Sequence, residues 1–310
     1  MYSKEEIELL RFCCLCPRRC GVDRFSKLVG FCKSDAGFHI SSICVHTGEE
    51  PVISGTKGIC NVFFPHCNLQ CVYCQNHDIS RNQGLIVADQ LSCEEVVEKI
   101  CDVLERTENI VGFVSPSHYI LQMMAIIRGL LQQGKKPIFV YNSNGYDSVG
   151  TLRMLEGIID VYLPDFKYLD ANLANDYSGA RNYPEVATQA IREMYRQKGS
   201  TLIVNDQGIA ESGIIVRHLV LPNASRQSAK VLKYIAEEIS PKLYISLMAQ
   251  YFPPFADDLP DEINRTLTPS EYQYVIDAFH RAGLFRGWIQ DLSSNAGFRP
   301  DFSNERPFGN

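Results

Sequence analysis

Three cysteines lie within eight residues in the stretch HCNLQCVYCQN, at positions 66–76. They are Cys67, Cys71 and Cys74, spaced C-x3-C-x2-C, and the aromatic Tyr73 directly precedes the last thiol. A [4Fe–4S] cluster that only transfers electrons usually binds four thiolates, one on each iron. Three thiolates would leave one iron open to a small molecule, and this is the chemistry that the spacing favours.

A zinc ion is the alternative ligand for this triplet. Structural zinc in proteins takes four ligands, and His66 or His77 could add the fourth to the three thiolates. The two alternatives differ in function, because structural zinc would leave no position for a reactant.

A second group of cysteines lies near the start of the chain. Cys13, Cys16, Cys20 and Cys32 have the spacing C-x2-C-x3-C-x11-C, and Cys14 is an alternative to Cys13. Four thiolates make a closed site, so either a structural zinc or a second, fully ligated iron–sulfur cluster fits. Buried free thiols are the remaining interpretation.

Composition excludes several classes of protein. The 310 residues carry 30 basic and 36 acidic side chains, a net charge of −6, with no basic block for a nucleic acid. No apolar run is long enough to cross a bilayer, and MYSKEEIELLRF lacks a signal pattern, so we expect a cytoplasmic protein without a membrane partner. In that reducing compartment, twelve cysteines indicate metal or redox chemistry, not disulfides.

Strand patterns alternate with helix patterns from residue 58 onward. The predicted strands are residues 58–64, 109–114, 137–142, 158–164, 213–221 and 243–249, with a short last strand in 285–291 and a hairpin in 200–219. The predicted helices are residues 92–107, 119–134, 151–157, 183–199, 225–239 and 269–283. This alternation predicts an α/β fold, with a parallel sheet and helices outside it.

Two architectures fit this alternation, an open doubly wound sheet and a barrel. No glycine-rich phosphate loop opens a helix, so the nucleotide-binding open sheet loses support. Polar residues gather at the ends of five predicted strands, at 115–118, 142–145, 165–167, 217–218 and 250–251. Because strand carboxyl ends build the sites of barrels, the pattern favours a barrel.

The cysteine triplet with its tyrosine resembles the signature of the radical S-adenosylmethionine (SAM) enzymes. From residue 13 to about 260, the chain is similar to proteins related to the activating enzyme of pyruvate formate-lyase. The stretches that carry this similarity, besides the triplet, are GEEPVISG, YNSNGY, DVYLPDFKY, IVRHLVLPN and MAQYFPP. The resemblance implies a partial (β/α)6 barrel of the TIM type at 58–292, a cysteine-rich extension at 1–57 and a tail at 293–310.

The resemblance also implies a reaction. The open iron would chelate the amino and carboxylate groups of SAM, and an electron from the reduced cluster would split the sulfonium C–S bond. The resulting 5′-deoxyadenosyl radical would take hydrogen from a protein or peptide, as in glycyl-radical activation. A small-molecule substrate and a non-enzymatic zinc protein are the alternatives. The implied partners are an electron donor such as flavodoxin or ferredoxin and a glycyl-radical enzyme, in an anaerobic setting.

The resemblance assigns further residues to SAM and to a nearby monovalent cation. These cofactor-binding candidates are Tyr73, Ser115, Ser117, Asn142, Asn144, Asp165, Lys167, Arg217 and Gln250. Lys167 or Arg217 can pair with the methionine carboxylate, and Asp165 can accept from an ammonium or coordinate a cation. An ordinary salt bridge at the strand end is the alternative for Asp165 and Lys167.

Two positions depart from the pattern of that family. A Gly-Gly-Glu stretch that meets the amino group of the methionine is replaced by residues 113–118, where backbone carbonyls with Ser115 or Ser117 would serve instead. Asn142 stands where the family has an aspartate, which removes one negative charge from the cation site.

Other residues are candidates for contact with the substrate. His118, Tyr141, Tyr168, His218 and Gln250 lie near predicted strand ends, although a histidine there is more often a hydrogen-bonded structural group.

The tail at 293–310 has no periodicity but carries three aromatic residues, Phe298, Phe302 and Phe308. Two alternatives follow: the tail is disordered, or it docks across the barrel mouth as a lid that would exclude water and oxygen. The aromatic side chains favour docking.

Overall fold

One large sheet forms the centre of the computed structural model. The model describes residues 2–26, 29–84, 86–254, 259–296, 300–304 and 306–308. The strands lie in the spatial order β11 (Gly287–Ile289), β10 (Tyr244–Met248), β9 (Ala210–Leu219), β7 (Val161–Pro164), β6 (Ile138–Ser143), β5 (Ile110–Val114), β3 (Ile59–Phe63) and β2 (Ser42–His46). A further strand, β8 (Ile203–Val204), pairs with β9 in the predicted hairpin.

The spatial order of these strands settles which architecture the chain adopts. From β3 to β11 each strand lies next to the one before it in the sequence, and all these pairs are parallel. A doubly wound sheet would reverse its order at a switch point. The α/β partial barrel is therefore confirmed. Within the described part of the chain, β2 and β11 end the order without pairing, so the barrel is open there.

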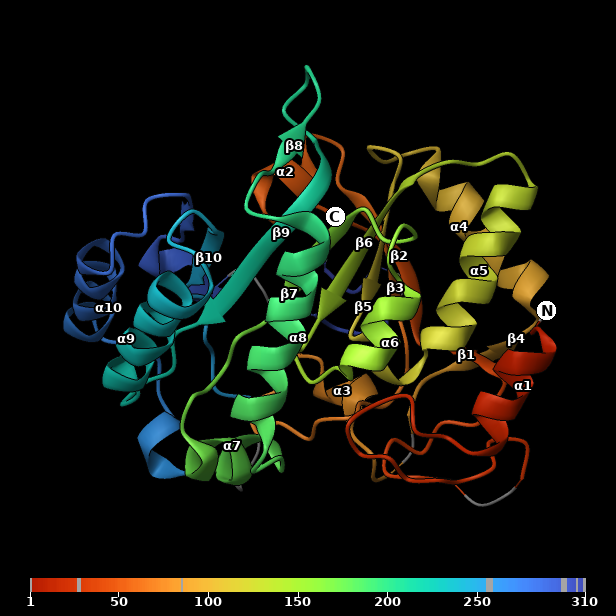
Figure 1. Ribbon diagram of the computed structural model, residues 1–310, viewed down its shortest axis with the longest axis horizontal. Coiled ribbons are helices and arrows are strands. Elements are labelled where there is room, and N and C mark those ends of the chain that lie inside the picture. The colour runs from red at the N-terminus through yellow and green to blue at the C-terminus, as the bar shows by residue number, and fades with distance from the viewer. Residues whose placement is uncertain are drawn as a thin grey trace.

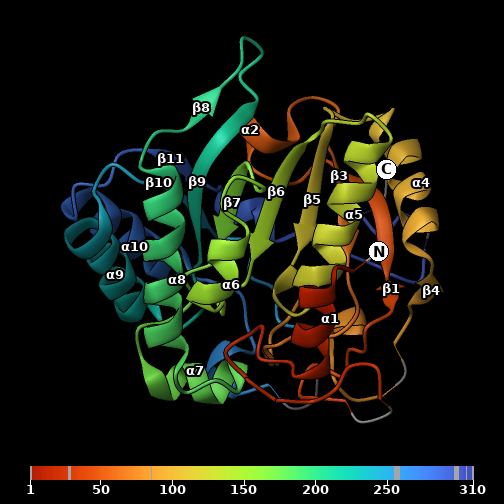
Figure 2. The same cartoon turned by 45° about the vertical axis from the view of Figure 1, so that its right-hand side comes forward.

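Most of the helices that connect the strands lie along the outer side of the sheet (Figures 1 and 2). They are α4 (Cys93–Leu104), α5 (Ile120–Gln132), α6 (Val149–Met154), α8 (Tyr183–Lys198), α9 (Ser225–Tyr234) and α10 (Pro269–Arg281). The short helix α7 (Ala171–Ser178) lies instead beyond the strand ends, at the bottom of both views. Ser92 caps α4 and Thr268 caps α10, each in a capping box with a glutamate three residues later, as the sequence predicted for Ser92. No described helix combines the length and apolarity needed to span a bilayer.

The first fifty-seven residues pack directly onto the barrel. They contain α1 (Lys4–Arg11), β1 (Phe38–Ile40), β2 and α2 (Pro51–Ser54), and α3 (His77–Ser80) and β4 (Asp89–Leu91) follow β3. The strand β2 extends the main sheet as its antiparallel edge, and β1 pairs with β4. The carboxylate of Glu6 in α1 accepts from Nη1 and Nη2 of Arg128 in α5, at 2.8 and 2.9 Å. The cysteine-rich region thus shares its core with the barrel.

The tail also returns to the barrel where the structure describes it. The ring centroid of Phe63, at the end of β3, lies 5.2 Å from that of Phe302 and 5.7 Å from that of Phe308. Phe308 also lies 4.1 Å from the ring of His46 in β2. Phe298 lies outside the described residues. The described aromatic side chains therefore dock at the open edge of the barrel, near β2.

One glycine lets two strand ends approach each other closely. Gly145 follows β6 with a φ of +80°, and a Cβ there would lie 2.2 Å from the backbone oxygen of Asp165. The hydroxyl of Tyr183 donates to the carbonyls of Asn144 and Asp165, which joins the same two strand ends. A side chain at position 145 would push these ends apart.

We expect Gly145→Ala to lower the free energy of unfolding by roughly 3 kcal/mol, because it combines a strained φ with a backbone clash. Urea denaturation measures this change. The matched control is Gly150→Ala in α6, where no atom lies within 4 Å of the new Cβ. This control should be neutral or slightly stabilising; equal losses in both variants would contradict the account.

Candidate functional site

A cavity of about 420 Å³ lies inside the curve of the sheet. Residues of β2, β3, β6, β9, β10 and β11 line it, together with the segments that follow β5 and β7. The predicted site residues that line it are Cys67, Cys71, Tyr73, Cys74, Ser115, Asn142, Asn144, Asp165, Lys167, Arg217 and Gln250. Residues as far apart as 67 and 250 in the sequence thus share one chamber.

The first thiol of the triplet is the most deeply buried. Cys67 is 8% exposed, and its sulfur accepts from the backbone amide of Leu69 at 3.4 Å and from Nδ2 of Asn144 at 3.3 Å. Asn144 also donates to Oδ1 of Asn68 at 2.8 Å, so it ties the strand end of β6 to the cysteine loop. Burial raises the pKa of the Cys67 thiol to about 12, and a bound metal would displace the proton from it.

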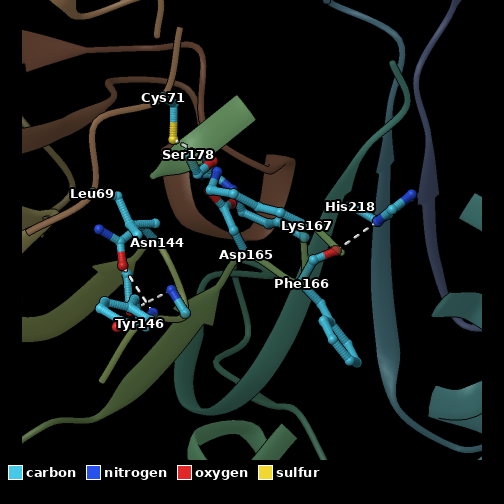
Figure 3. Close-up of polar contacts among 12 residues, drawn as sticks. Leu69, Cys71, Asn144, Tyr146, Asp165, Phe166, Lys167, Ser178 and His218 are labelled. Carbon is cyan, nitrogen blue, oxygen red and sulfur yellow. Dashed lines mark hydrogen bonds and ion pairs between the residues drawn. The ribbon is translucent and has the colours of Figure 1, made fainter. Parts of the chain in front are cut away.

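The other two thiols have hydroxyl partners. The Cys71 sulfur lies 3.0 Å from Oγ of Ser178 at the end of α7, and the hydroxyl of Ser80 donates to the Cys74 sulfur at 3.2 Å. Figure 3 shows Cys71 pointing toward Ser178 above the Asp165 and Lys167 side chains. Hydroxyl and amide donors around sulfur stabilise thiolates, and they tune iron–sulfur clusters.

The loop of the triplet is held by backbone bonds to α7. The amides of Gln70 and Val72 donate to the carbonyls of Ser178 and Tyr177, at 3.3 and 2.9 Å. Tyr73 is buried, and its hydroxyl bonds that of Tyr168. The loop after β3 is therefore fixed against the opposite side of the barrel mouth.

The residues around the triplet fit a cluster better than a zinc ion with a histidine ligand. The three thiols line the chamber, whereas neither His66 nor His77 does. A four-iron cluster places each thiolate on its own iron, so its sulfurs surround a cube and need not converge on a point. The three thiols line one chamber and each has a hydrogen-bond partner, which suits that arrangement. A zinc site completed by His66 or His77 finds no support here.

A chain of buried charges crosses the chamber next to the thiols. Nζ of Lys167 lies 2.6 Å from Oδ2 of Asp165, and Nε of Arg217 lies 3.4 Å from the other oxygen of that carboxylate. Nη1 of Arg217 lies 2.8 Å from Oε2 of Glu49. Burial acts to raise the pKa of Asp165, but Lys167 and Arg217 outweigh it and hold the pKa below its usual value.

Two adjacent glutamates, Glu49 and Glu50, lie next to Arg217 at the end of this row of charges farthest from the thiols. Glu49 also accepts from Nδ2 of Asn61 at 3.0 Å and of Asn142 at 3.2 Å, and Arg217 holds its pKa low although burial opposes this. Glu50 lies 4.0 Å from Arg217, and its Oε2 is buried without a hydrogen-bond partner among the described residues. Burial raises the pKa of Glu50. The unpartnered oxygen of Glu50 is therefore available to bind a cation or, when protonated, to donate a proton.

Sequence reasoning missed both glutamates as site residues. The signal was present, because two adjacent acids before a proline stand in the GEEPVISG stretch. Nothing local showed that this stretch reaches the interior, since the contact of Glu49 with Arg217 spans 168 positions.

Several predicted residues lie outside the chamber lining. Ser117 is buried beside the hydrogen-bonded pair of Tyr141 and Asp147. Nε2 of His118 lies 2.8 Å from the carbonyl of Pro65. Each of these groups is a buried structural partner in this structure.

His218 is also turned away from the thiols. Its Nδ1 lies 2.6 Å from the carbonyl of Phe166, and Figure 3 shows the ring directed to the side opposite Cys71. Tyr168 bonds Tyr73 and Ser178. The position of Arg217 and His218 also differs from the prediction, because both lie within β9 and not beyond its end.

The four front cysteines form a separate group. Cys13, Cys16, Cys20 and Cys32 line a small second cavity, whereas Cys14 is exposed and does not line it. The structure therefore brings together the four positions that the spacing selected, with Cys13 in place of Cys14.

Comparison with known proteins gives limited relationships. No protein-family model matches the chain. A relative from Methanocaldococcus jannaschii, "Uncharacterized protein MJ0674", is 27% identical over 285 residues, which cover 89% of this chain and 76% of that protein.

Solved structures give weaker similarities. AnSMEcpe with bound AdoMet is 16% identical with a TM-score of 0.46, over 72% of this chain and 62% of that one. SuiB of Streptococcus suis bound to S-adenosylmethionine is 11% identical with a TM-score of 0.47, over 74% of this chain and 51% of that one. HydG, a maturase of the [FeFe]-hydrogenase, is 12% identical with a TM-score of 0.48, over 76% of this chain and 53% of that one. This chain spans under two thirds of each of them, and because each TM-score lies below 0.5 we draw no conclusion from them.

We expect the free energy of unfolding to fall between pH 7 and pH 5, and His218→Gln to reduce this fall. Burial lowers the pKa of His218 from 6.5 to about 4, so in this range the unfolded chain binds a proton that the folded chain does not. The contribution is complete above pH 6.5 and is lost as the pH falls toward 4. At pH 5 the loss is about 2 kcal/mol.

Urea denaturation at each pH measures this slope. The matched control is His280→Gln, which changes an exposed histidine of α10. This control should keep the slope of the wild-type protein, and an unchanged slope in His218→Gln would contradict the role given to burial.

Proposed function

We propose that the chain is a radical SAM enzyme. One observation carries the proposal: three thiols line a chamber that also contains a half-buried ammonium and a half-buried guanidinium, of Lys167 and Arg217. A [4Fe–4S] cluster bound by Cys67, Cys71 and Cys74 would supply the electron that cleaves SAM and so starts hydrogen abstraction. The chamber volume of about 420 Å³ lies in the range of small-molecule sites.

The side chains of this chamber have distinct tasks in that reaction. Lys167 and Arg217 present positive charge where the carboxylate of the methionine part would lie, and a charge-assisted bond is strong in a buried site. Asp165 accepts from Lys167 and forms an ion pair with Arg217, and these contacts would keep both cations in place. Tyr73 and Gln250 line the wall beside the thiols.

The amino group of the methionine part needs an acceptor. Ser115 lines the chamber at the end of β5 and has a φ of +48°, so the backbone turns sharply there. This turn supports the idea that backbone carbonyls of 113–118 replace the Gly-Gly-Glu stretch. Nδ2 of Asn142 donates to Glu49, which leaves the Asn142 amide oxygen for another contact. A monovalent cation would bind near Asn142 and Asp165.

For the substrate, the resemblance to glycyl-radical activases supports a protein or peptide, such as a glycyl-radical enzyme. The same resemblance supports a flavodoxin or ferredoxin as the electron donor, in an anaerobic cell. The support for these partners is the likeness of the sequence motifs alone.

A small-molecule substrate is the second candidate, and the tail favours it. Phe308 and Pro300 line the chamber, and Phe308 packs on His46 and Phe63. The open edge between β2 and β11 is therefore partly covered by the chain itself, which leaves less room for a polypeptide. The unpartnered Oε2 of Glu50 gives such a molecule a buried carboxyl group to contact.

We expect anaerobically reconstituted and chemically reduced protein to release 5′-deoxyadenosine from SAM, and Cys71→Ser to release at least a hundredfold less. Removing one thiolate removes a ligand of the cluster, and with it the electron that splits SAM. Chromatography of the quenched reaction measures the product.

The matched control is Cys101→Ser in α4, which does not line the chamber and should keep the wild-type rate. Zinc at the triplet with no product from any variant would overturn the radical proposal. Iron and sulfide at the triplet without product would instead show that a further component is required.

The two substrate classes separate in a second experiment. An extract of cells grown in deuterated medium is separated by an ultrafiltration membrane into a protein fraction and a small-molecule filtrate. Each fraction is then added separately to the reduced enzyme with SAM. Deuterium in 5′-deoxyadenosine only with the retained fraction supports a protein substrate. Deuterium only with the filtrate supports a small molecule.

A further inference from the structure

The four front cysteines surround a common gap. Cys13, Cys16, Cys20 and Cys32 line a cavity of about 10 Å³, the lower limit for a single water. The described residues of the segment that carries them, between α1 and β1, form no helix or strand. In small metal sites the metal commonly supplies part of the stability of such a segment.

Each of the four sulfurs accepts a hydrogen bond from nitrogen. In the turn from Cys16 to Cys20, the backbone amide of Arg18 bonds the Cys16 sulfur, and the amide of Phe31 donates to the Cys20 sulfur at 3.3 Å. Gly30 makes the second contact feasible, because a Cβ there would lie 2.9 Å from the Cys20 sulfur. Backbone N–H groups that point at sulfur suit a thiolate.

A buried cation serves the other two sulfurs. Arg24 is 3% exposed; its Nε donates to the Cys13 sulfur at 3.1 Å and its Nη2 to the Cys32 sulfur at 3.7 Å. Its Nη1 donates to the carbonyl of His118 at 2.7 Å. No ion pair with a described carboxylate within 4.0 Å compensates the guanidinium.

A buried guanidinium without a negative partner is costly. Neutral thiols at Cys13 and Cys32 would leave Arg24 without a counter-charge, whereas thiolates provide one directly. Four thiolates this close together repel one another unless a cation binds among them. A dipositive metal centre among the four thiolates removes most of this repulsion, and the guanidinium of Arg24 offsets part of the negative charge that is left.

We propose that Cys13, Cys16, Cys20 and Cys32 bind a metal centre through four thiolates, with Arg24 as the buried cation that offsets its negative charge. The centre is one zinc ion or one [4Fe–4S] cluster, since both accept four thiolates. No described group of three or more His, Cys, Asp or Glu side chains is preformed around a point. The sulfurs therefore draw together around an ion or take separate irons.

The centre would also brace the loop of the cysteine triplet. Nε of Arg18 donates to the carbonyl of Asn68 at 2.9 Å. Nδ2 of Asn82 donates both to the carbonyl of Phe31 at 2.8 Å and to that of Cys67 at 2.9 Å. The two segments of the front site, around Arg18 and around Phe31, thus contact the loop that begins at Cys67. The proposed centre itself takes no part in the cleavage of SAM.

Metal and sulfide analysis of protein isolated without reconstitution tests the proposal. A triple variant, Cys67→Ser with Cys71→Ser and Cys74→Ser, should retain one zinc ion or one [4Fe–4S] cluster per chain. Cys20→Ser should lose that metal, and the matched control Cys14→Ser should keep the wild-type content, because Cys14 is exposed beside the site.

Zinc in the triple variant identifies a structural ion, and iron with sulfide identifies a second cluster; either result supports the four-thiolate centre. A triple variant without metal overturns it, and this arm does not depend on whether Cys20→Ser folds. Equal metal in Cys20→Ser and the wild type also overturns it. None of these measurements requires SAM cleavage.

Discussion

The ion pair between Arg217 and Glu49 is the constraint on which the chamber depends. The Glu49 side chain is buried and that of Arg217 is mostly so, and a charge withdrawn from water needs a partner. Their contact, 2.8 Å long, joins β9 to the turn before α2. Asp165 and Lys167 extend the pairing to the end of β7, next to Cys71. Removing any one of these four side chains would leave a charge without a partner inside the barrel. The positions of Glu49, near α2, and of Lys167, near the thiols, therefore depend on each other.

The cysteine loop depends on contacts from three directions. The end of β6 reaches it through Asn144, α7 through the carbonyls of Tyr177 and Ser178, and the front segment through Arg18. None of these contacts lies within the loop itself. A short loop with three thiols therefore keeps its shape because the surrounding elements are rigid. This is the support that a reactive cofactor requires from its site.

Periodic elements and short motifs could be predicted from the sequence. The alternation from residue 58 gave the six strand–helix units, and Ser92 marked the start of its helix because a capping box is a local interaction. The edge strand β2 and the role of Glu49 could not be predicted. Both depend on contacts between residues that are not sequence neighbours. The strand β2 pairs with β3 across a connection that contains α2, and Glu49 contacts Arg217 across 168 positions.

The sequence by itself limited the chemistry of the triplet to two kinds of metal centre, through the types and spacing of Cys67, Cys71 and Cys74. It also determined the alternation of strands and helices, because each element has its own period, whereas the spatial order of the strands came from the tertiary structure. Only the tertiary structure decided which polar residues share the chamber. It placed Glu49 and Glu50 inside and turned His218 toward the carbonyl of Phe166, because burial forces each polar group to the nearest partner that satisfies it.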